Sequence, residues 1–357
     1  MIDPVIFLLI IIISCGLLNG LFRPGYTSRY LTAILPGFII LLYASLEAFA
    51  LAVLSLISFT LLYFISRKSG NKRIRNYLPY AGLALLLIPD YANAIKEGNI
   101  LFIGSAFFIV RQFVTVKECV KQSVNTREYF LSSGLATFFF ASLFTGPVFS
   151  GYDTHQQLKK NNPAEEKTGL FKVLEGFAFI LPVSAGINWL QKQLSIIERK
   201  NDELLIELLS QFLAHPVLAF AFVFSTFFGY SKVAEGVANL MGFSVPENFK
   251  QPHKSKSFSD FWQRWHRSMA DFVMKYLYLP ISINLKKPKV GLFAAFVFMG
   301  LWHNVSPGYV VWGLAHASAL VWLQPMMNTG KINSAFSRII TLTFVIYISY
   351  IANYWLA

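Results

Sequence analysis

The sequence predicts an all-α protein: a multi-pass transmembrane bundle of about nine to eleven membrane helices, plus one amphipathic helix at the membrane surface. Composition is the first reason. The 357 residues are 55% hydrophobic and only 14% charged, whereas about a quarter of the residues in a soluble domain are charged. The mean hydropathy of +0.51 agrees. The second reason is that the apolar residues form long runs, many of them near the roughly 20 residues that cross a bilayer.

The apolar runs follow one another along the whole chain. They are Val5–Leu21, Leu31–Ile65, Tyr77–Ile88, Leu101–Val116, Tyr129–Phe149, Leu170–Leu190, Leu204–Tyr230, Val290–His303, Tyr309–Trp322 and Ile339–Trp355. The second run is interrupted only by Glu47, and we expect it to hold two passes, or one pass and a re-entrant piece. Several runs are short for a full crossing, which predicts tilted or broken helices. No polar stretch is long enough to bury its own core, so residues 1–357 should form one membrane domain.

The formal charge of +13 lies in short clusters between the apolar runs. This pattern is typical of the cytoplasmic loops of a multi-pass protein and does not indicate a nucleic-acid surface. Three loops are basic: residues 67–75, 250–256 and 286–289. We expect all three on the cytoplasmic face, because positively charged loops stay there.

Residues 258–278 are unusually rich in aromatic and charged side chains. Apolar residues recur at spacings of three and four, which predicts an amphipathic helix along a membrane face. Ser257 and Asp260 form a plausible cap at its start, and Asp260 and Arg264 are spaced for an ion pair. His266 lies at the apolar edge. The simplest interpretation is a surface helix whose histidine faces inward.

Two more histidines lie in the next apolar segments. His303 ends one run and His316 sits inside the next, with Ser-Pro-Gly at 306–308 between them. Ionisable residues in apolar spans are rare and often line a cavity or a reaction site. The structural alternatives are a helix-end histidine at headgroup level for His303 and a bond to a neighbouring helix for His316. Five of the seven tryptophans lie between residues 262 and 322, where they could wall a water-poor chamber.

Three blocks of this chain resemble the membrane-bound O-acyltransferase (MBOAT) family, in its bacterial branch that acylates cell-envelope polymers. They are GYSKVAEGVANLMGFSVPENFKQP (229–252), SFSDFWQRWHRSM with YLYLPI (257–281), and GLWHNVSPGYVVWGLAHA (300–317). LFTGPVFSGY (143–152) is a weaker match. Together the blocks cover most of residues 143–322.

The resemblance implies an acyltransferase of the bacterial cytoplasmic membrane, with its active site in a channel inside the bilayer. It places the essential histidine at His303 and a second catalytic histidine at His266. The supporting residues expected around them are His316, Trp302, Asn304, Trp265, Arg264 and Trp262. An imidazole can take the proton of a weakly nucleophilic hydroxyl as that hydroxyl attacks a thioester. Aromatic walls would exclude the water that would otherwise hydrolyse the donor.

The resemblance also implies partners, but no metal and no tightly bound cofactor. The donor would be a cytoplasmic thioester, on the phosphopantetheine of an acyl-carrier protein or as acetyl-coenzyme A. The acceptor would be a hydroxyl of a polymer outside the membrane, reached directly or through a second acyltransferase. PENF and YLYLPI resemble the alginate-acetylating branch, whereas the single helix expected after His316 resembles the D-alanyl branch. Both acyl groups stay open.

Some residues depart from the family pattern. Asn304 stands where a glycine is usual, Lys232 where an acid is usual, and Met274-Lys275 where an Arg-Asp pair is usual. These departures leave the histidines in place and bear on the acceptor. The rival functions are a transporter or channel whose buried histidines relay protons, and a scaffold without chemistry. Transporters commonly show inverted repeats, and the sequence has no visible repeat.

Overall fold

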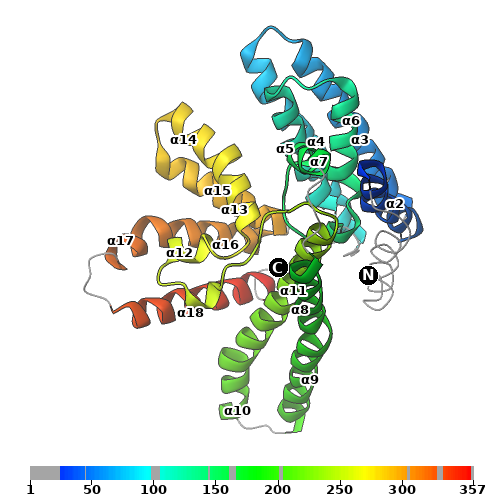
Figure 1. Ribbon diagram of the computed structural model, residues 1–357. Helices are drawn as coiled ribbons and strands as arrows, with labels where there is room; N and C mark the ends of the chain where they lie inside the picture. Colours follow the sequence, from blue (N-terminus) through cyan, green and yellow to red (C-terminus); the bar gives the residue numbers. More distant parts are fainter. Residues whose placement is uncertain are drawn as a thin grey trace. The chain divides into compact units, whose positions relative to one another are not determined.

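The computed structural model describes residues 25–44, 46–97, 105–143, 145–160, 166–200, 204–303, 306–327 and 333–354. These residues form helices joined by short loops and turns, with no strand among them (Figure 1). The all-α prediction is therefore confirmed for the described part of the chain. The chain divides into two compact units, Met1–Phe177 with Tyr230–Pro246, and Ala178–Gly229 with Glu247–Ala357.

The first unit contains the helices that precede the aromatic segment. They are α2 (Tyr26–Ala44), α3 (Leu46–Lys68), α4 (Lys72–Glu97), α5 (Ser105–Lys121), α6 (Thr126–Phe138), α7 (Gly151–Lys159) and α8 (Glu166–Ala178). The apolar run 31–65 lies in two helices, α2 and α3, and α3 contains a segment long and apolar enough to cross a membrane, Ala48–Lys68. The expected helix at Val5–Leu21 lies outside the described residues.

Helix α5 forms the core of the first unit, where α3, α4 and α6 pack against it. Two of its polar side chains, Arg111 and Gln112, are buried with it and bind main-chain carbonyls. Arg111 Nη1 donates to the Ser142 carbonyl at 2.9 Å, and Gln112 Nε2 donates to the Ser133 carbonyl at 2.9 Å. A buried polar group is expensive without such a partner. These bonds therefore hold α6 and the chain that follows it against α5.

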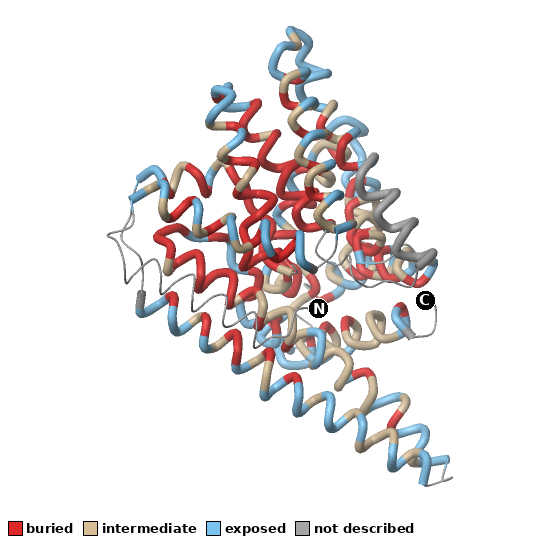
Figure 2. The backbone as a smooth tube through the Cα atoms, turned by 90° about the vertical axis from the view of Figure 1, so that its right-hand side faces the viewer, coloured by how far each residue is buried: buried red, intermediate tan, exposed pale blue. Residues whose placement is uncertain are grey.

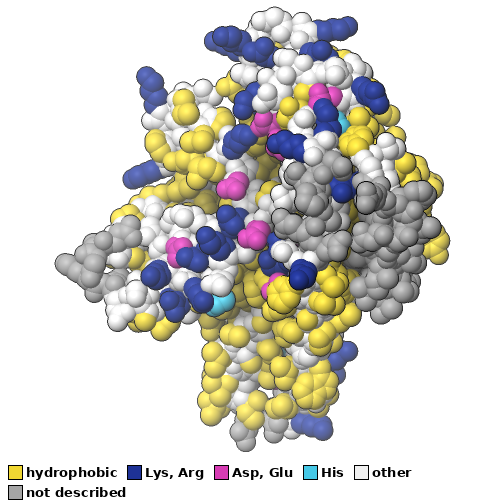
Figure 3. All heavy atoms as spheres, viewed as in Figure 1, with side chains coloured by type: hydrophobic (Ala, Val, Ile, Leu, Met, Phe, Trp, Pro, Cys, Tyr) yellow, Lys and Arg dark blue, Asp and Glu magenta, His cyan; other side chains and the backbone are white. Residues whose placement is uncertain are grey.

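The second unit contains the predicted site. Its helices are α9 (Ser184–Lys200), α10 (Leu204–Leu209), the first part of α11 (His215–Leu240), α12 (Phe258–Trp262), α13 (Arg267–Val273), α14 (Leu279–Leu285), α15 (Pro288–His303), α16 (Pro307–Ser318), α17 (Gln324–Met327) and α18 (Ser334–Tyr354). Helices α9 and α10 form a hairpin whose surface is largely hydrophobic (Figures 1 and 3). Buried residues are more frequent in α13, α15 and α16, and Figure 2 shows by colour how burial varies along the backbone.

In the described part of the second unit, four π-helical turns interrupt the helices, and each contains a proline or is followed by one two residues later. They are η3 (Phe179–Val183), η4 (Ser210–Ala214), η6 (Met274–Tyr278) and η7 (Ala319–Leu323), and the prolines are Pro182, Pro216, Pro280 and Pro325. Proline has no N–H for the carbonyl four residues earlier, and it widens the turn before it. The carbonyl four residues before Pro216 belongs to Phe212, and the Tyr347 hydroxyl of α18 donates to it. A side chain thus replaces the bond that proline removes.

Five helical segments among the described residues are long and apolar enough to cross a membrane. They are Ala48–Lys68, Lys167–Lys200, Leu204–Leu240, Pro307–Met327 and Ser334–Asn353. Helix α15 is apolar but shorter. The expected count of nine to eleven membrane helices is not confirmed. The basic residues 67–75 and 286–289 lie, as expected, at turns between helices, where α3 meets α4 and α14 meets α15.

Candidate active site

His303 is the last residue of α15, and close packing of α15 on α16 places it. Two glycines make that packing possible. A Cβ atom on Gly300 would lie 2.0 Å from the carbonyl oxygen of Tyr309, and one on Gly313 would lie 2.4 Å from that of Phe296. Only glycine allows the two backbones to approach so closely. The ring of His303 therefore lies beside the first turns of α16.

A cavity of ≈ 180 Å³ in the second unit is lined by His303. Its walls come from α11, α12, α16 and α18 together with Trp265, and half of the residues in them are aromatic. The His303 side chain is exposed, and its ring centroid lies 5.7 Å from that of Tyr309 and 5.5 Å from that of Trp312. An imidazole that is accessible in an aromatic chamber can exchange a proton with a bound hydroxyl while little water is present.

A polar group forms one part of this wall. The Tyr309 hydroxyl donates to Asn353 Oδ1 at 2.5 Å, Asn353 Nδ2 donates to the Ser349 carbonyl at 2.8 Å, and Trp312 Nε1 donates to Ser349 Oγ at 3.1 Å. Sequence reasoning missed Tyr309, Ser349 and Asn353, and it also missed Tyr350 in the same lining, whereas Trp312 is one of the tryptophans expected to wall a chamber. The available signal was a serine and an asparagine four residues apart in an apolar helix, which places both on one face.

The predicted continuous helix over 258–278 is wrong. The chain forms α12, breaks at residues 263–266, and resumes as α13 and η6. His266 has a φ of +44°, in the left-handed region. Tertiary hydrogen bonds hold the break, since the Lys250 amide donates to the Arg264 carbonyl at 2.9 Å and the Arg267 amide donates to the Asn248 carbonyl at 3.0 Å. The segment 247–250 thus binds the backbone that a helix would have kept for itself.

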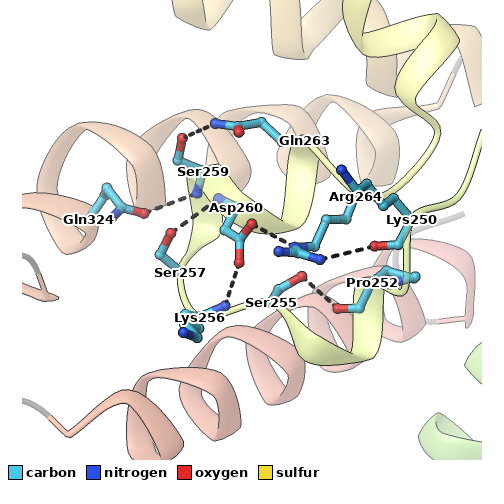
Figure 4. Close-up of polar contacts among 10 residues, drawn as sticks. All are labelled: Lys250, Pro252, Ser255, Lys256, Ser257, Ser259, Asp260, Gln263, Arg264 and Gln324. Atoms are coloured by element: carbon cyan, nitrogen blue, oxygen red, sulfur yellow. Dashed lines mark hydrogen bonds and ion pairs between the residues drawn. The ribbon is translucent and has the colours of Figure 1, made fainter.

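The start of this segment agrees with the sequence. Ser257 Oγ accepts from the Asp260 amide at 3.1 Å, and Asp260 Oδ1 accepts from Arg264 Nε at 2.6 Å (Figure 4). Burial raises the pKa of the Asp260 carboxyl, but hydrogen bonds from the Lys256 amide and the Arg264 guanidinium, with the charges of both residues, outweigh it and lower that pKa overall. The carboxylate therefore stays ionised and holds Arg264 in place.

A second, larger pocket of ≈ 640 Å³ lies in the same unit, next to α12 and α13. Lys250, Arg264 and Arg267 contribute positive charge to its lining, and Asp260 and Asp271 contribute negative charge. In Figure 4 the Arg264 side chain lies between the Asp260 carboxylate and the Lys250 carbonyl, to which its Nη1 donates at 3.2 Å. Basic and acidic side chains are interspersed on the surface over α12 and α13 (Figure 3). The rest of the lining is largely apolar, so the pocket suits a chain that carries an anionic group.

Trp262 lines both the His303 cavity and this charged pocket. Helix α15 passes along both of them. Its residues Leu292, Ala295, Phe296 and Met299 line the charged pocket, and His303, one turn beyond Met299, lines the smaller cavity. The two spaces therefore follow one another along α15, with the indole of Trp262 between them.

The structure brings only some of the predicted site residues together. His303, Trp262 and Trp265 line the cavity, and Arg264 lines the charged pocket. His266, His316 and Trp302 are buried and are absent from both linings as described. Asn304 lies outside the described residues.

The two buried histidines have different surroundings. The ring of His266 meets that of Phe227 edge-on at 4.7 Å. Burial, and to a smaller extent the charge of nearby His303, lowers the pKa of His266 well below its ordinary value. A neutral His266 beside His303 agrees with a supporting role. His316 packs against Trp312 at 4.3 Å and Trp262 at 5.1 Å, and neither of its ring nitrogens has a hydrogen-bond partner among the described residues.

Comparison with known proteins places this chain among membrane enzymes. Residues 43–354 match the family model for MBOAT, the membrane-bound O-acyltransferase family. The chain is 37% identical over 106 residues to "Teichoic acid D-alanyltransferase" of Bacillus subtilis, covering 27% of each chain. It is 26% identical over 276 residues to "Probable alginate O-acetylase AlgI" of Pseudomonas fluorescens, covering 73% of this chain and 54% of that one.

A third relative is "Peptidoglycan O-acetyltransferase" of Helicobacter pylori, 34% identical over 107 residues, which is 29% of this chain and 20% of that one. The alignments therefore span at most about half the length of these three relatives. The family model, in contrast, extends over most of this chain and includes every described residue of the His303 cavity. The resemblance inferred from the three sequence blocks is thus confirmed: the chain belongs to the membrane-bound O-acyltransferase family.

Proposed function

We propose that this protein is an O-acyltransferase of the bacterial cytoplasmic membrane. It moves a small acyl group, acetyl or D-alanyl, from a thioester made in the cytoplasm to a hydroxyl of a cell-envelope polymer. The observation that carries the proposal is the position of His303. This imidazole is exposed in an aromatic cavity, and a larger charged pocket lies on the other side of Trp262.

His303 acts as the general base in this proposal. The acceptor oxygen attacks the thioester carbonyl carbon, and its proton passes to the imidazole. The new C–O bond forms as the C–S bond breaks, and the imidazolium returns the proton to the leaving thiolate. The products are an ester and a free thiol, so no other reactant is needed. His266, buried and neutral, supports His303 without reaching the cavity.

The charged pocket would receive the donor. Coenzyme A and the phosphopantetheine of a carrier protein both carry phosphate, which suits Lys250, Arg264 and Arg267. The apolar part of the lining suits the pantetheine arm. The thioester at the end of that arm has to pass Trp262 to reach His303. A carrier protein or acetyl-coenzyme A is therefore the proposed partner on this side.

The direction of transfer follows from α15. The helix begins beside Lys286, Lys287 and Lys289, which we place on the cytoplasmic face because positively charged loops stay there. It has 16 residues and ends at His303, so the imidazole lies ~24 Å from the lysine end at 1.5 Å per residue. The acceptor would approach from the side away from the lysines.

The test uses the full chain in lipid nanodiscs with two donors, acetyl-coenzyme A and a D-alanyl carrier protein. The acceptors are the polymers named for the relatives: alginate, teichoic acid and peptidoglycan fragments. We expect ester formation and thiol release with one donor–acceptor pair. His303→Ala should lower the rate by at least about 100-fold, the usual contribution of a general base, His266→Ala should lower it less, and His316→Ala should change it least.

His316→Ala is the matched control. Like His303, the imidazole of His316 packs against aromatic rings, but it lies outside the cavity lining. A His303→Ala protein with near-normal turnover would remove the proposed base. Wild-type protein that transfers neither acyl group to any of the three polymers would contradict the proposed function.

A further inference from the structure

The polar side chains at the end of α18 have no role in the chemistry described so far. Residues Ser334–Asn353 of α18 are long and apolar enough to cross a membrane. Near its end, Ser349 and Asn353 lie in the lining of the His303 cavity with Tyr309 of α16. Polar residues inside membrane helices usually face a functional interior. Their position in the same cavity lining as the imidazole therefore needs an explanation.

The hydrogen bonds of this group fix the amide of Asn353. Its Oδ1 accepts from the Tyr309 hydroxyl at 2.5 Å, and its Nδ2 donates to the Ser349 carbonyl at 2.8 Å. A primary amide has two N–H donors and two acceptor lone pairs. Among the described residues these two bonds leave one donor and one lone pair of the amide unused, and the Asn353 side chain is exposed in the cavity lining. The amide is thus held in one orientation with capacity for one more polar partner.

We propose that Asn353 is a positioning residue for the acceptor: its amide binds a hydroxyl of a polyhydroxy chain, and Tyr309 holds that amide. The inference rests on the proposed function and assigns the acceptor side of the same site. A hydroxyl both donates and accepts, and the free half of the Asn353 amide complements it. The attacking hydroxyl would give its proton to His303 as its oxygen bonds to the acyl carbon and the thiol leaves.

Charge separates this subsite from the donor pocket. Tyr309, Ser349 and Asn353 are uncharged, whereas the pocket beyond Trp262 carries three basic and two acidic side chains. An uncharged amide and hydroxyl group suits a sugar or glycerol-type hydroxyl and offers no counter-ion to a phosphate.

The experiment measures steady-state transfer by the full chain in nanodiscs, with donor and acceptor varied separately. Asn353→Leu keeps the side-chain size but removes the amide. We expect it to lower kcat/KM for the acceptor by about tenfold, the value of one hydrogen bond of ~1.4 kcal/mol, with the KM for the donor unchanged. Tyr309→Phe, which removes the hydroxyl that holds the amide, should lower the same parameter by a smaller factor.

The matched control for Tyr309→Phe is Tyr347→Phe. It removes one hydroxyl that also bonds within this unit, to the Phe212 carbonyl, and lies outside the cavity lining. It should leave the acceptor parameters unchanged. If Asn353→Leu and Tyr309→Phe both keep the wild-type kcat/KM for the acceptor, or if donor and acceptor parameters fall together, Asn353 has only a structural role and the inference is overturned.

A binding measurement keeps this inference separate from the proposed function. An alginate oligosaccharide, a glycerol-phosphate oligomer and a peptidoglycan fragment are titrated without donor against wild-type, Asn353→Leu and Tyr347→Phe protein. Binding that Asn353→Leu weakens and Tyr347→Phe retains supports the subsite even if no acyl transfer is found. Equal binding to all three proteins, or binding to none of them, contradicts it.

Discussion

Replacing Gly300 by alanine tests whether the α15–α16 contact positions the catalytic histidine. The added Cβ would lie 2.0 Å from the Tyr309 carbonyl oxygen, so α16 must retreat by about 1.4 Å to restore an ordinary contact of 3.4 Å. The atom in the way is backbone and cannot rotate aside. Overpacking of this kind costs about 1–3 kcal/mol, and it moves Tyr309 away from His303.

The consequence for activity should exceed the consequence for stability. A displacement near 1 Å can lower a rate by ~100-fold when the reacting groups must be aligned. We therefore expect Gly300→Ala to remain folded, to unfold several degrees earlier, and to lose most of its acyl transfer. The assays are thermal unfolding in nanodiscs and thiol release with the donor–acceptor pair that wild-type protein uses.

Gly186→Ala is the matched control in the same unit. A Cβ there meets no heavy atom within 4 Å, and alanine favours a helix over glycine by up to about 1 kcal/mol. This variant should be as active as wild type and as stable or slightly more so. If Gly300→Ala matches it in both measurements, the two helices do not depend on the close contact and the reasoning fails.

Three further predictions concern topology, pH and donor encounter. In a background without Cys15 and Cys119, cysteines placed at Ser69 and Lys287 should react with an impermeant thiol reagent only after the cells are opened, because both basic loops should be cytoplasmic; ready labelling of either one in intact cells overturns this. The Asp260 pKa is lowered from its ordinary value of 3.8. The ionised Asp260 carboxylate therefore stabilises the folded protein above that pH, and this stabilisation is lost as the pH falls through the lower pKa of the folded state. The unfolding temperature of Asp260→Asn should therefore fall less than that of wild type as the pH is lowered. An equally steep fall in the two proteins would contradict a stabilising role for the Asp260–Arg264 ion pair. Replacing Lys286, Lys287 and Lys289 by glutamate should slow transfer at limiting donor, with a penalty that shrinks as salt rises; donor dependence like that of wild type would leave these lysines a topological role only.

Local pattern was enough to predict much of the fold. Apolar run length predicted helices throughout, and the described residues contain no strand. The Ser257 cap and the Asp260–Arg264 pair join residues three and four positions apart, and both are present. Such features depend on neighbours along one helix, which the sequence displays directly.

Features that depend on distant segments were not predictable in this way. The aromatic periodicity of 258–278 continues across the break at His266, so it predicted a continuous helix. The break exists because residues 248 and 250, on a loop before α12, bond its backbone. Asn353 was missed for a similar reason. It lies far from any recognised block, and only the packing of α16 and α18 brings it to the cavity that His303 lines.

The π-helical turns have a consequence for the evolution of the second unit. A turn of this kind holds one more residue than an α-helical turn, as a single inserted residue would. Each residue of an α-helix advances by 100°, so removing one residue from η7 would leave a continuous helix but rotate Gln324 by that angle. Its Oε1 now accepts from the Ser259 amide at 3.0 Å, at the start of α12. A one-residue deletion there would keep the secondary structure and break the bond that joins α12 to α17.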